Sequence, residues 1–198
     1  MTSRHLLALS TFAVAALAAI LIAALVLRNS DNSSAAEFDG AIMPAGVVAP
    51  DFHLKDQAGR SFDMAQYSGR PVIVTFLYSH CKDTCPVQAR LISSAVAELG
   101  HQVPVIAFSV DPTHDTGASV DRFMREQKVT ANIRWGLGTT KQLAPIWKGY
   151  AVTPQREDSE HMARIVLVDK LGFQKIGYPL EQTTPDRIAH DMRLLEKQ

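Results

Sequence analysis

The only two cysteines of this 198-residue chain, Cys81 and Cys85, lie four positions apart in the segment SHCKDTCP. An apolar run at 72–78 precedes them, and Pro86 favours the first turn of a helix. Side chains four apart on a helical turn are about 5–6 Å apart at Cβ, so the two sulfurs can bind one soft metal ion or close into a disulfide. A purely structural disulfide is the weaker interpretation, because closing so short a loop contributes only about 2 kcal/mol. The pair therefore predicts a redox or metal site.

The segments around the cysteines alternate between apolar β-type runs and helical patterns. Val87, Leu91, Ala95 and Leu99 form an apolar stripe on the expected helix after the cysteines, and Gly100 can end that helix. The predicted strands lie at 52–54, 61–62, 72–78, 103–110, 133–137, 165–168 and 173–176, and the predicted helices at 86–99, around 120–124, at 141–149 and from 184 onward. Helical crossovers between the early strands, followed by a closing hairpin, predict an α/β fold with a mixed sheet and helices on both faces.

The first part of the chain has a different composition. No charged residue occurs at 6–27, and a helix of that length spans about 30 Å of hydrocarbon, so we expect a transmembrane helix within a membrane anchor at 1–28. A cleaved signal peptide is the alternative, but its apolar region is usually about 7–15 residues long. Residues 29–46 are rich in Ser, Asn, Ala and Gly and predict a flexible tether, which leaves 47–198 as one folded domain.

Charge and leader composition limit the location and the partners. One arginine, Arg4, precedes the apolar run, and there is no Arg-rich amphipathic leader of the mitochondrial type. We therefore expect a single-pass protein of a bacterial cell membrane, with its soluble domain on the extracytoplasmic (periplasmic) side. The 20 Lys and Arg residues balance 20 Asp and Glu residues without a basic run, so we expect no nucleic-acid partner.

Four motifs, in this order along the chain, resemble those of the Sco/SenC family. They are APDF at 49–52, FLYSHCKDTCP at 76–86, SVDPTHDT at 109–116, and His161 shortly before IVLVD at 165–169. The resemblance extends over the whole expected soluble domain. It implies a thioredoxin-like fold, a single amino-terminal membrane helix, and a copper site formed by the cysteines of a C-x-x-x-C motif and a distant histidine.

On this resemblance the expected copper ligands are Cys81, Cys85 and His161, with one copper ion per chain. The expected function is that of a metallochaperone, not an enzyme, which helps assemble the binuclear copper centre of cytochrome c oxidase. Its expected partners are the copper-accepting oxidase subunit and a thiol reductant or another copper chaperone. Asp111 matches a family aspartate near the copper site and is a candidate for supporting the ligands or contacting a partner. Lys82 stands where the family often has proline, and its ammonium is expected to favour the thiolates.

The chemistry of these side chains agrees with copper but leaves alternatives open. Thiolates select Cu(I) and imidazole binds both copper states, so two sulfurs and one nitrogen can hold Cu(I) or Cu(II), although zinc is an alternative ion. His80, beside Cys81, and His114, in the turn after Asp111, are alternative ligands. The same two thiols can form a redox-active disulfide, so an extracytoplasmic thiol–disulfide oxidoreductase is the second functional hypothesis and a thiol peroxidase the third.

Overall fold

The computed structural model describes residues 37–155 and 163–198, so the predicted anchor at 6–27 and His161 both lie outside the described residues. Within the described ranges, no helix combines the length and the apolar character needed to cross a membrane. The helices and strands, in chain order, are β1 (Ala41–Ile42), β2 (His53–Lys55), β3 (Ser61–Asp63), the 3-10 helix η2 (Met64–Tyr67), β4 (Val72–Leu77), α2 (Thr84–Leu99), β5 (Val105–Ser109), α3 (Gly117–Glu126), β6 (Ile133–Gly136), α4 (Thr140–Gly149), β7 (Arg164–Val168), β8 (Gln174–Pro179), the 3-10 helix η3 (Leu180–Gln182) and α5 (Pro185–Lys197).

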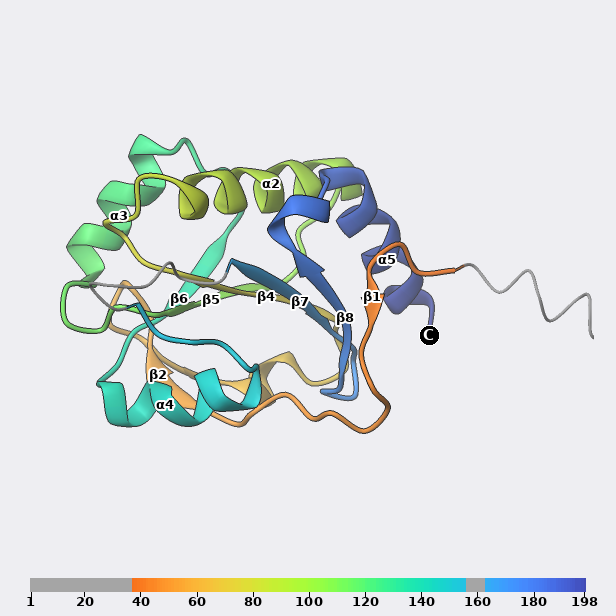
Figure 1. The fold of residues 1–198 in the computed structure, drawn as a ribbon, viewed down its shortest axis with the longest axis horizontal. Coiled ribbons are helices and arrows are strands. Elements are labelled where there is room, and N and C mark those ends of the chain that lie inside the picture. The colour runs from red at the N-terminus through yellow and green to blue at the C-terminus, as the bar shows by residue number, and fades with distance from the viewer. Residues whose placement is uncertain (1–36, 156–162) are drawn as a thin grey trace, which may run out of the picture. The chain divides into compact units, whose positions relative to one another are not determined.

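The central sheet has six strands in the order β1-β8-β7-β4-β5-β6 (Figure 1). The strands β4, β5 and β6 run parallel to one another, whereas β7 is antiparallel to both β4 and β8. The hairpin of β2 and β3 forms a separate small sheet. The predicted mixed sheet is therefore confirmed, and β4, which leads to the cysteines, lies in its interior.

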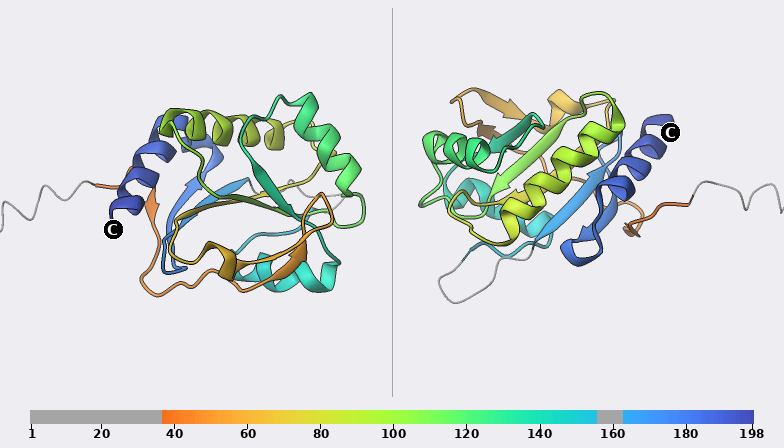
Figure 2. Two further views of the ribbon diagram at one scale, coloured as in Figure 1. Left: turned by 180° about the vertical axis from the view of Figure 1, so that it is seen from behind. Right: turned by 90° about the horizontal axis from the view of Figure 1, so that it is seen from above.

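Helices cover both faces of this sheet. The helices α2, α3 and α5 lie on one side of the sheet, and α4 and the β2–β3 hairpin lie on the other (Figures 1 and 2). One apolar cluster joins the sheet to α2, α3 and α5, and a second joins its other face to α4 and the hairpin. Along β4 the side chains alternate between the two clusters, with Ile73 and Leu77 in the first and Val74 and Phe76 in the second. All six residues of β4 are buried, as the continuous apolar run at 72–78 predicts.

The apolar stripe predicted for the helix after the cysteines is wrong at its first residues. Val87 is 41% exposed, while the side chains of α2 that pack on the sheet include Ala89, Ile92 and Val96. Residues four apart advance by 400° around a helix, which is about 40° more than a full turn. A stripe built only from such steps therefore drifts away from the buried face. The end of the helix is as predicted, since Gly100 caps it with a left-handed φ of 75°.

The domain contacts of the chain begin before the predicted domain start at residue 47. Phe38 packs against the first apolar cluster, and β1 pairs with β8 at the edge of the sheet. The backbone N–H groups of Asp39 and Gly40 donate hydrogen bonds of 2.8 and 2.9 Å to the two carboxylate oxygens of Asp191, a buried residue of α5. The second half of the predicted tether therefore lies along the folded domain.

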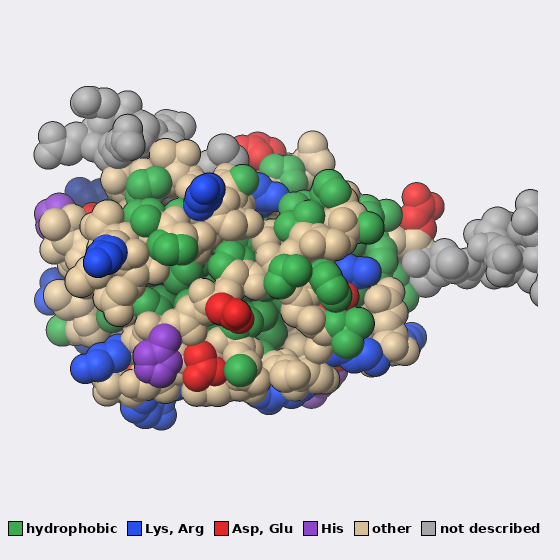
Figure 3. Space-filling model, turned by 90° about the horizontal axis from the view of Figure 1, so that it is seen from below, with side chains coloured by type: hydrophobic (Ala, Val, Ile, Leu, Met, Phe, Trp, Pro, Cys, Tyr) green, Lys and Arg blue, Asp and Glu red, His purple; other side chains and the backbone are tan. Residues whose placement is uncertain are grey.

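The face of the domain that lies below α4 in Figure 1 carries charged side chains of both signs. On this face, lysine and arginine side chains are scattered between acidic and apolar ones and form no continuous basic field (Figure 3). Nucleic-acid binding usually needs a clustered basic surface, so this face offers no support for such a function.

Candidate functional site

The two cysteines lie where a central strand passes into a helix. β4 ends at Leu77, a short loop follows, and α2 begins at Thr84, so Cys81 precedes the helix and Cys85 lies in its first turn. Because β4 and β5 are parallel, with Leu77 opposite Ser109, the carboxyl ends of both strands lie at the same end of the sheet. Open α/β sheets usually carry their functional groups at this carboxyl end of the strands. The predicted placement of both thiols is confirmed.

The two thiols are free and closely associated. The backbone N–H of Cys85 donates a hydrogen bond of 3.3 Å to the sulfur of Cys81, and the hydroxyl of Thr84 lies 3.7 Å from that sulfur. Cys81 is 7% exposed and Cys85 is completely buried. The pair is therefore asymmetric, with one sulfur near the surface and the other behind it.

Hydrogen bonds and burial shift the two thiol groups in opposite directions. The Cys85 thiol and the backbone N–H groups of Cys85 and Asp83 donate to the Cys81 sulfur and lower the pKa of Cys81 to about 4, although burial opposes this. Burial and the neighbouring Cys81 thiolate raise the pKa of Cys85. The sequence predicted that the ammonium of Lys82 favours the thiolates, but Lys82 is not among the main causes of the lowered pKa of Cys81. The helix start thus favours a thiolate on Cys81, not on both residues equally.

Tyr78 and Asp115 support the cysteine loop, and the sequence reasoning had given neither a role. The hydroxyl of Tyr78 hydrogen-bonds to the Cys81 sulfur, and burial together with this bond raises the pKa of the phenol. The buried carboxylate of Asp115 accepts hydrogen bonds from the backbone N–H of Ser79 at 2.8 Å and from the hydroxyl of Ser109 at 2.6 Å. Burial raises the pKa of Asp115. A signal was present in the sequence, because both residues lie inside the motifs quoted for the family.

The turn after β5 holds the other predicted residues. Asp111 is half-buried and its carboxylate accepts hydrogen bonds from Thr113 and His114. His80 and His114 are both exposed, with their ring centroids 6.0 Å apart. The structure thus brings these two histidines together beside Cys81, while Asp111 serves mainly its own turn. His161 lies outside the described residues, so its predicted role as a ligand stays a prediction.

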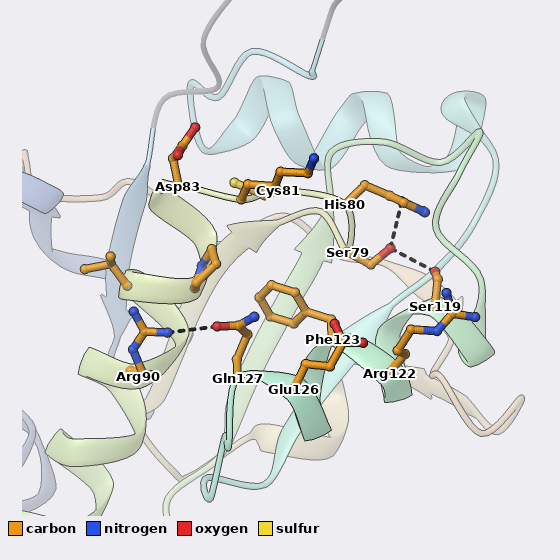
Figure 4. Close-up of a pocket in the computed structure, with 13 residues that line it drawn as sticks. Ser79, His80, Cys81, Asp83, Arg90, Ser119, Arg122, Phe123, Glu126 and Gln127 are labelled. Carbon is orange, nitrogen blue, oxygen red and sulfur yellow. Dashed lines mark hydrogen bonds between the residues drawn. The ribbon is translucent and has the colours of Figure 1, made fainter.

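A groove of about 740 Å³ gives access to this site (Figure 4). It runs between the cysteine loop, the start of α2, and α3, with Cys81 in its wall. Phe123 contributes apolar surface, and the charged side chains include Lys82 and Arg122. The groove lets another molecule approach Cys81, whereas the buried Cys85 is screened from it.

Two adjacent sulfurs of this kind can bind one soft metal ion or be oxidised to a disulfide. A mixed sheet that presents a thiol pair at the start of a helix places the chain in the class of proteins with a thioredoxin-like fold. The SCO1/SenC family profile matches residues 41–196. The chain belongs to the SCO1/SenC family.

Comparison with known proteins agrees with this assignment. The human "Protein SCO2 homolog, mitochondrial" is 29% identical over 131 residues, which cover 62% of this chain and 48% of that protein. The chain spans about half the length of the SCO2 homologues it matches, with 48% to 55% covered. The structure of Bradyrhizobium japonicum ScoI with copper bound aligns with a TM-score of 0.63 and 27% identity, covering 74% of this chain and 98% of that one.

BsSco, described as a member of the Sco family of cytochrome c oxidase assembly proteins with a disulfide switch, aligns with a TM-score of 0.68. It is 19% identical, and the alignment covers 79% of this chain and 98% of that one. At this identity the likeness supports the fold alone. It confirms the thioredoxin-like arrangement that the sequence predicts.

Proposed function

We propose that this protein is a copper chaperone that binds one copper ion through Cys81, Cys85 and His161 and delivers it to the binuclear copper centre of cytochrome c oxidase. The ion is cargo and not a resident cofactor. The expected partners are the copper-accepting oxidase subunit and a thiol reductant or another copper chaperone that keeps the site usable. The proposal includes a membrane anchor at 1–28 and an extracytoplasmic domain, as the composition of the chain suggests.

The observation that carries the proposal is the paired, unoxidised thiols of Cys81 and Cys85 at the start of α2. Thiolates are the protein ligands that best suit Cu(I), and Cys81 is favoured as a thiolate by its hydrogen bonds. Membership of the SCO1/SenC family and the likeness to copper-bound ScoI support copper over zinc. A site with two sulfurs and one further ligand leaves room for a ligand from an acceptor, as transfer requires.

Metal analysis of the full-length protein tests this function. Protein purified under reducing conditions should take up about one Cu(I) per chain. The Cys81→Ser, Cys85→Ser double variant has lost both sulfurs and should bind no copper at this site. His53→Gln is a suitable control, because that side chain is 77% exposed on the distant β2–β3 hairpin. Equal Cu(I) uptake by the double variant and the wild type would rule out the proposed ligands.

A second candidate function is thiol–disulfide exchange with cysteines of the copper acceptor or other exported proteins. The different burial of the two thiols favours it, since Cys81 borders the groove and Cys85 lies behind it. Such an arrangement suits attack by one thiol on a partner disulfide and resolution by the other. A disulfide-reduction assay on metal-free protein distinguishes the two functions, because turnover with a protein disulfide would support exchange, and copper uptake without turnover would support delivery.

A further inference from the structure

Two exposed imidazole rings meet directly beside the cysteine loop. The ring centroids of His80 and His114 are 6.0 Å apart and their planes are inclined by 74°. His80 precedes Cys81, while His114 comes from the turn after β5, so the fold joins residues from two segments. The side chain of His114 is 69% exposed. An ion from solvent can therefore reach both rings.

The partners of His114 determine which ring nitrogen is available. Its Nδ1 lies 2.9 and 2.8 Å from the two carboxylate oxygens of Asp111, which can only accept. The proton of a neutral His114 is therefore on Nδ1, and the lone pair is on Nε2. A histidine that binds a metal commonly has this arrangement, with its second nitrogen donating to a carboxylate.

His80 is oriented in the same way by a chain of hydroxyl groups. Its Nδ1 lies 3.1 Å from the hydroxyl oxygen of Ser79, and that hydroxyl donates its own proton to Ser119 at 2.8 Å (Figure 4). The oxygen of Ser79 must therefore accept the proton from His80 Nδ1. The lone pair of His80 is left on Nε2, as it is in His114.

We propose that His80 and His114 form a second metal site, distinct from the cysteine pair, which binds a Cu(II) ion through the two Nε2 atoms. With metal–nitrogen bonds of about 2.0–2.1 Å, two imidazoles on one ion have ring centres about 5–6.5 Å apart, and the observed separation lies in that range. Imidazole binds Cu(II) more strongly than the other divalent first-row ions. Water completes the coordination on the exposed side.

This site extends the function proposed above. If Cys81 and Cys85 receive copper, an ion at His80 lies one residue away from the first sulfur, and it can pass from nitrogen to sulfur ligands as Cu(II), without a change of oxidation state and without leaving the protein. That role rests on the proposed function. The binding of Cu(II) by the histidine pair does not, because it depends only on the two imidazoles and on Asp111 and Ser79, which orient them.

The test uses full-length protein with Cys81→Ser and Cys85→Ser, so that no thiol can bind or reduce the ion. Copper(II) sulfate is titrated into this protein and into versions that also carry His80→Gln or His114→Gln, while electron paramagnetic resonance records the nitrogen couplings. His101→Gln is the matched control. That residue also has a carboxylate partner, Glu196 at 2.7 Å, but none of the ring contacts in the described residues joins it to a second imidazole.

Each histidine substitution should weaken one Cu(II) site at least 10-fold and remove one nitrogen coupling, while His101→Gln should change neither. Asp111→Asn should weaken the same site by about 10-fold, the usual effect of losing such a carboxylate. Equal Cu(II) binding by the thiol-free protein and its His80→Gln and His114→Gln versions would overturn the inference and leave the rings as an edge-to-face contact. Failure of Cu(I) uptake by the protein with intact cysteines would instead contradict the proposed function and leave this result unaffected.

Discussion

The backbone N–H of Ser79 donates a hydrogen bond of 2.8 Å to the carboxylate of Asp115, although the two residues are 36 positions apart. The same carboxylate accepts a bond of 2.6 Å from Ser109 at the end of β5. Ser79 begins the loop that carries Cys81. One buried carboxylate therefore joins the cysteine loop to the neighbouring strand and fixes where that loop begins.

Replacing Asp115 with alanine should disturb this loop. The Asp115→Ala change leaves the Ser79 N–H and the Ser109 hydroxyl without their acceptor, so the free energy of unfolding should fall by about 1–3 kcal/mol. Copper affinity should fall as well, because the loop is less constrained.

Urea unfolding and Cu(I) titration measure the two effects. Asp169→Ala is the control, since Asp169 is also buried and accepts from Leu171 and Phe173 in a distant turn. A loss of copper affinity equal to that of the control would argue against a specific role.

Replacing His161 with alanine should weaken Cu(II) more than Cu(I). Two thiolates alone remain a good Cu(I) site, whereas Cu(II) gains more from an imidazole. Separate affinity titrations with the two ions, together with the Cu(II)–thiolate absorption spectrum, measure the difference. An unchanged spectrum and unchanged Cu(II) affinity would mean that the third ligand is another residue.

Oxidation should make the cysteine site unable to bind copper. The backbone N–H of Cys85 lies 3.3 Å from the Cys81 sulfur, so the two thiols adjoin, and a disulfide between them leaves no thiolate for the ion. If the domain lies outside the cytoplasm, as proposed, oxidation is favoured there, so a reductant or a bound copper ion has to protect the pair. Protein equilibrated in glutathione buffers and titrated with Cu(I) should lose copper uptake in proportion to its loss of free thiol. Full uptake by fully oxidised protein would refute this mechanism.

Shortening the chain should have little effect until Phe38 is reached. A protein that starts at Phe38 should be as stable as the full-length chain and bind copper equally well. A protein that starts at Val47 should fold but lose about 2–4 kcal/mol of stability. It lacks β1 and the two backbone N–H groups that donate to the carboxylate of Asp191. Thermal and urea unfolding of the two proteins give the comparison. Asp191→Ala in the longer protein should reproduce much of the loss, and equal stability of both shortened proteins would show that these contacts contribute nothing.

The stability of the fold should depend on the ionisation of Asp56. Burial alone would raise the pKa of this carboxyl group, but hydrogen bonds from the backbone of Arg60 and from the side chains of Arg134 and Arg60 hold it below its usual value. A lowered pKa in the folded state means that the carboxylate stabilises the protein above about pH 3.9. This stabilisation is lost as the pH falls through the folded-state pKa.

Asp56→Asn should therefore cost about 2–4 kcal/mol at neutral pH and progressively less in acid. Urea unfolding of both proteins from neutral pH down to about pH 3 measures the difference. Asp63→Asn, on the neighbouring strand, is the control with a more exposed carboxylate. A difference between wild type and Asp56→Asn that stays constant with pH would contradict the assignment.

The sequence predicted the main elements because their patterns are strong. The run at 72–78 was apolar throughout, as a strand covered on both faces requires, and Gly100 marked the end of α2. The two cysteines were located correctly because a strand followed by Pro86 fixes where the helix starts. The buried face of α2 was partly misjudged, since which side of a helix packs inward depends on the neighbours it meets. Val87 faces the groove even though its own side chain is apolar.

The supporting residues of the site were harder to predict because their partners are distant in the sequence. Asp115 and Ser79 meet only after β4 and β5 have paired, and Asp39 meets Asp191 only after β1 has joined the sheet. The same contact set includes His190, whose Nδ1 lies 3.1 Å from Asp39 and 3.0 Å from Asp191. No local pattern indicates such contacts. They follow from topology.

If Cys81 and Cys85 bind copper as proposed, the complete burial of Cys85 behind Cys81 would give metal exchange at this pair a fixed order. The groove borders Cys81 and not Cys85, so a ligand arriving through it would meet the ion on the side of Cys81. Cys81 would then be the first sulfur to give up the ion, and Cys85 the last. Release from the deeper sulfur would thereby wait until an acceptor has bound the ion, so that copper would not leave the protein as a free ion.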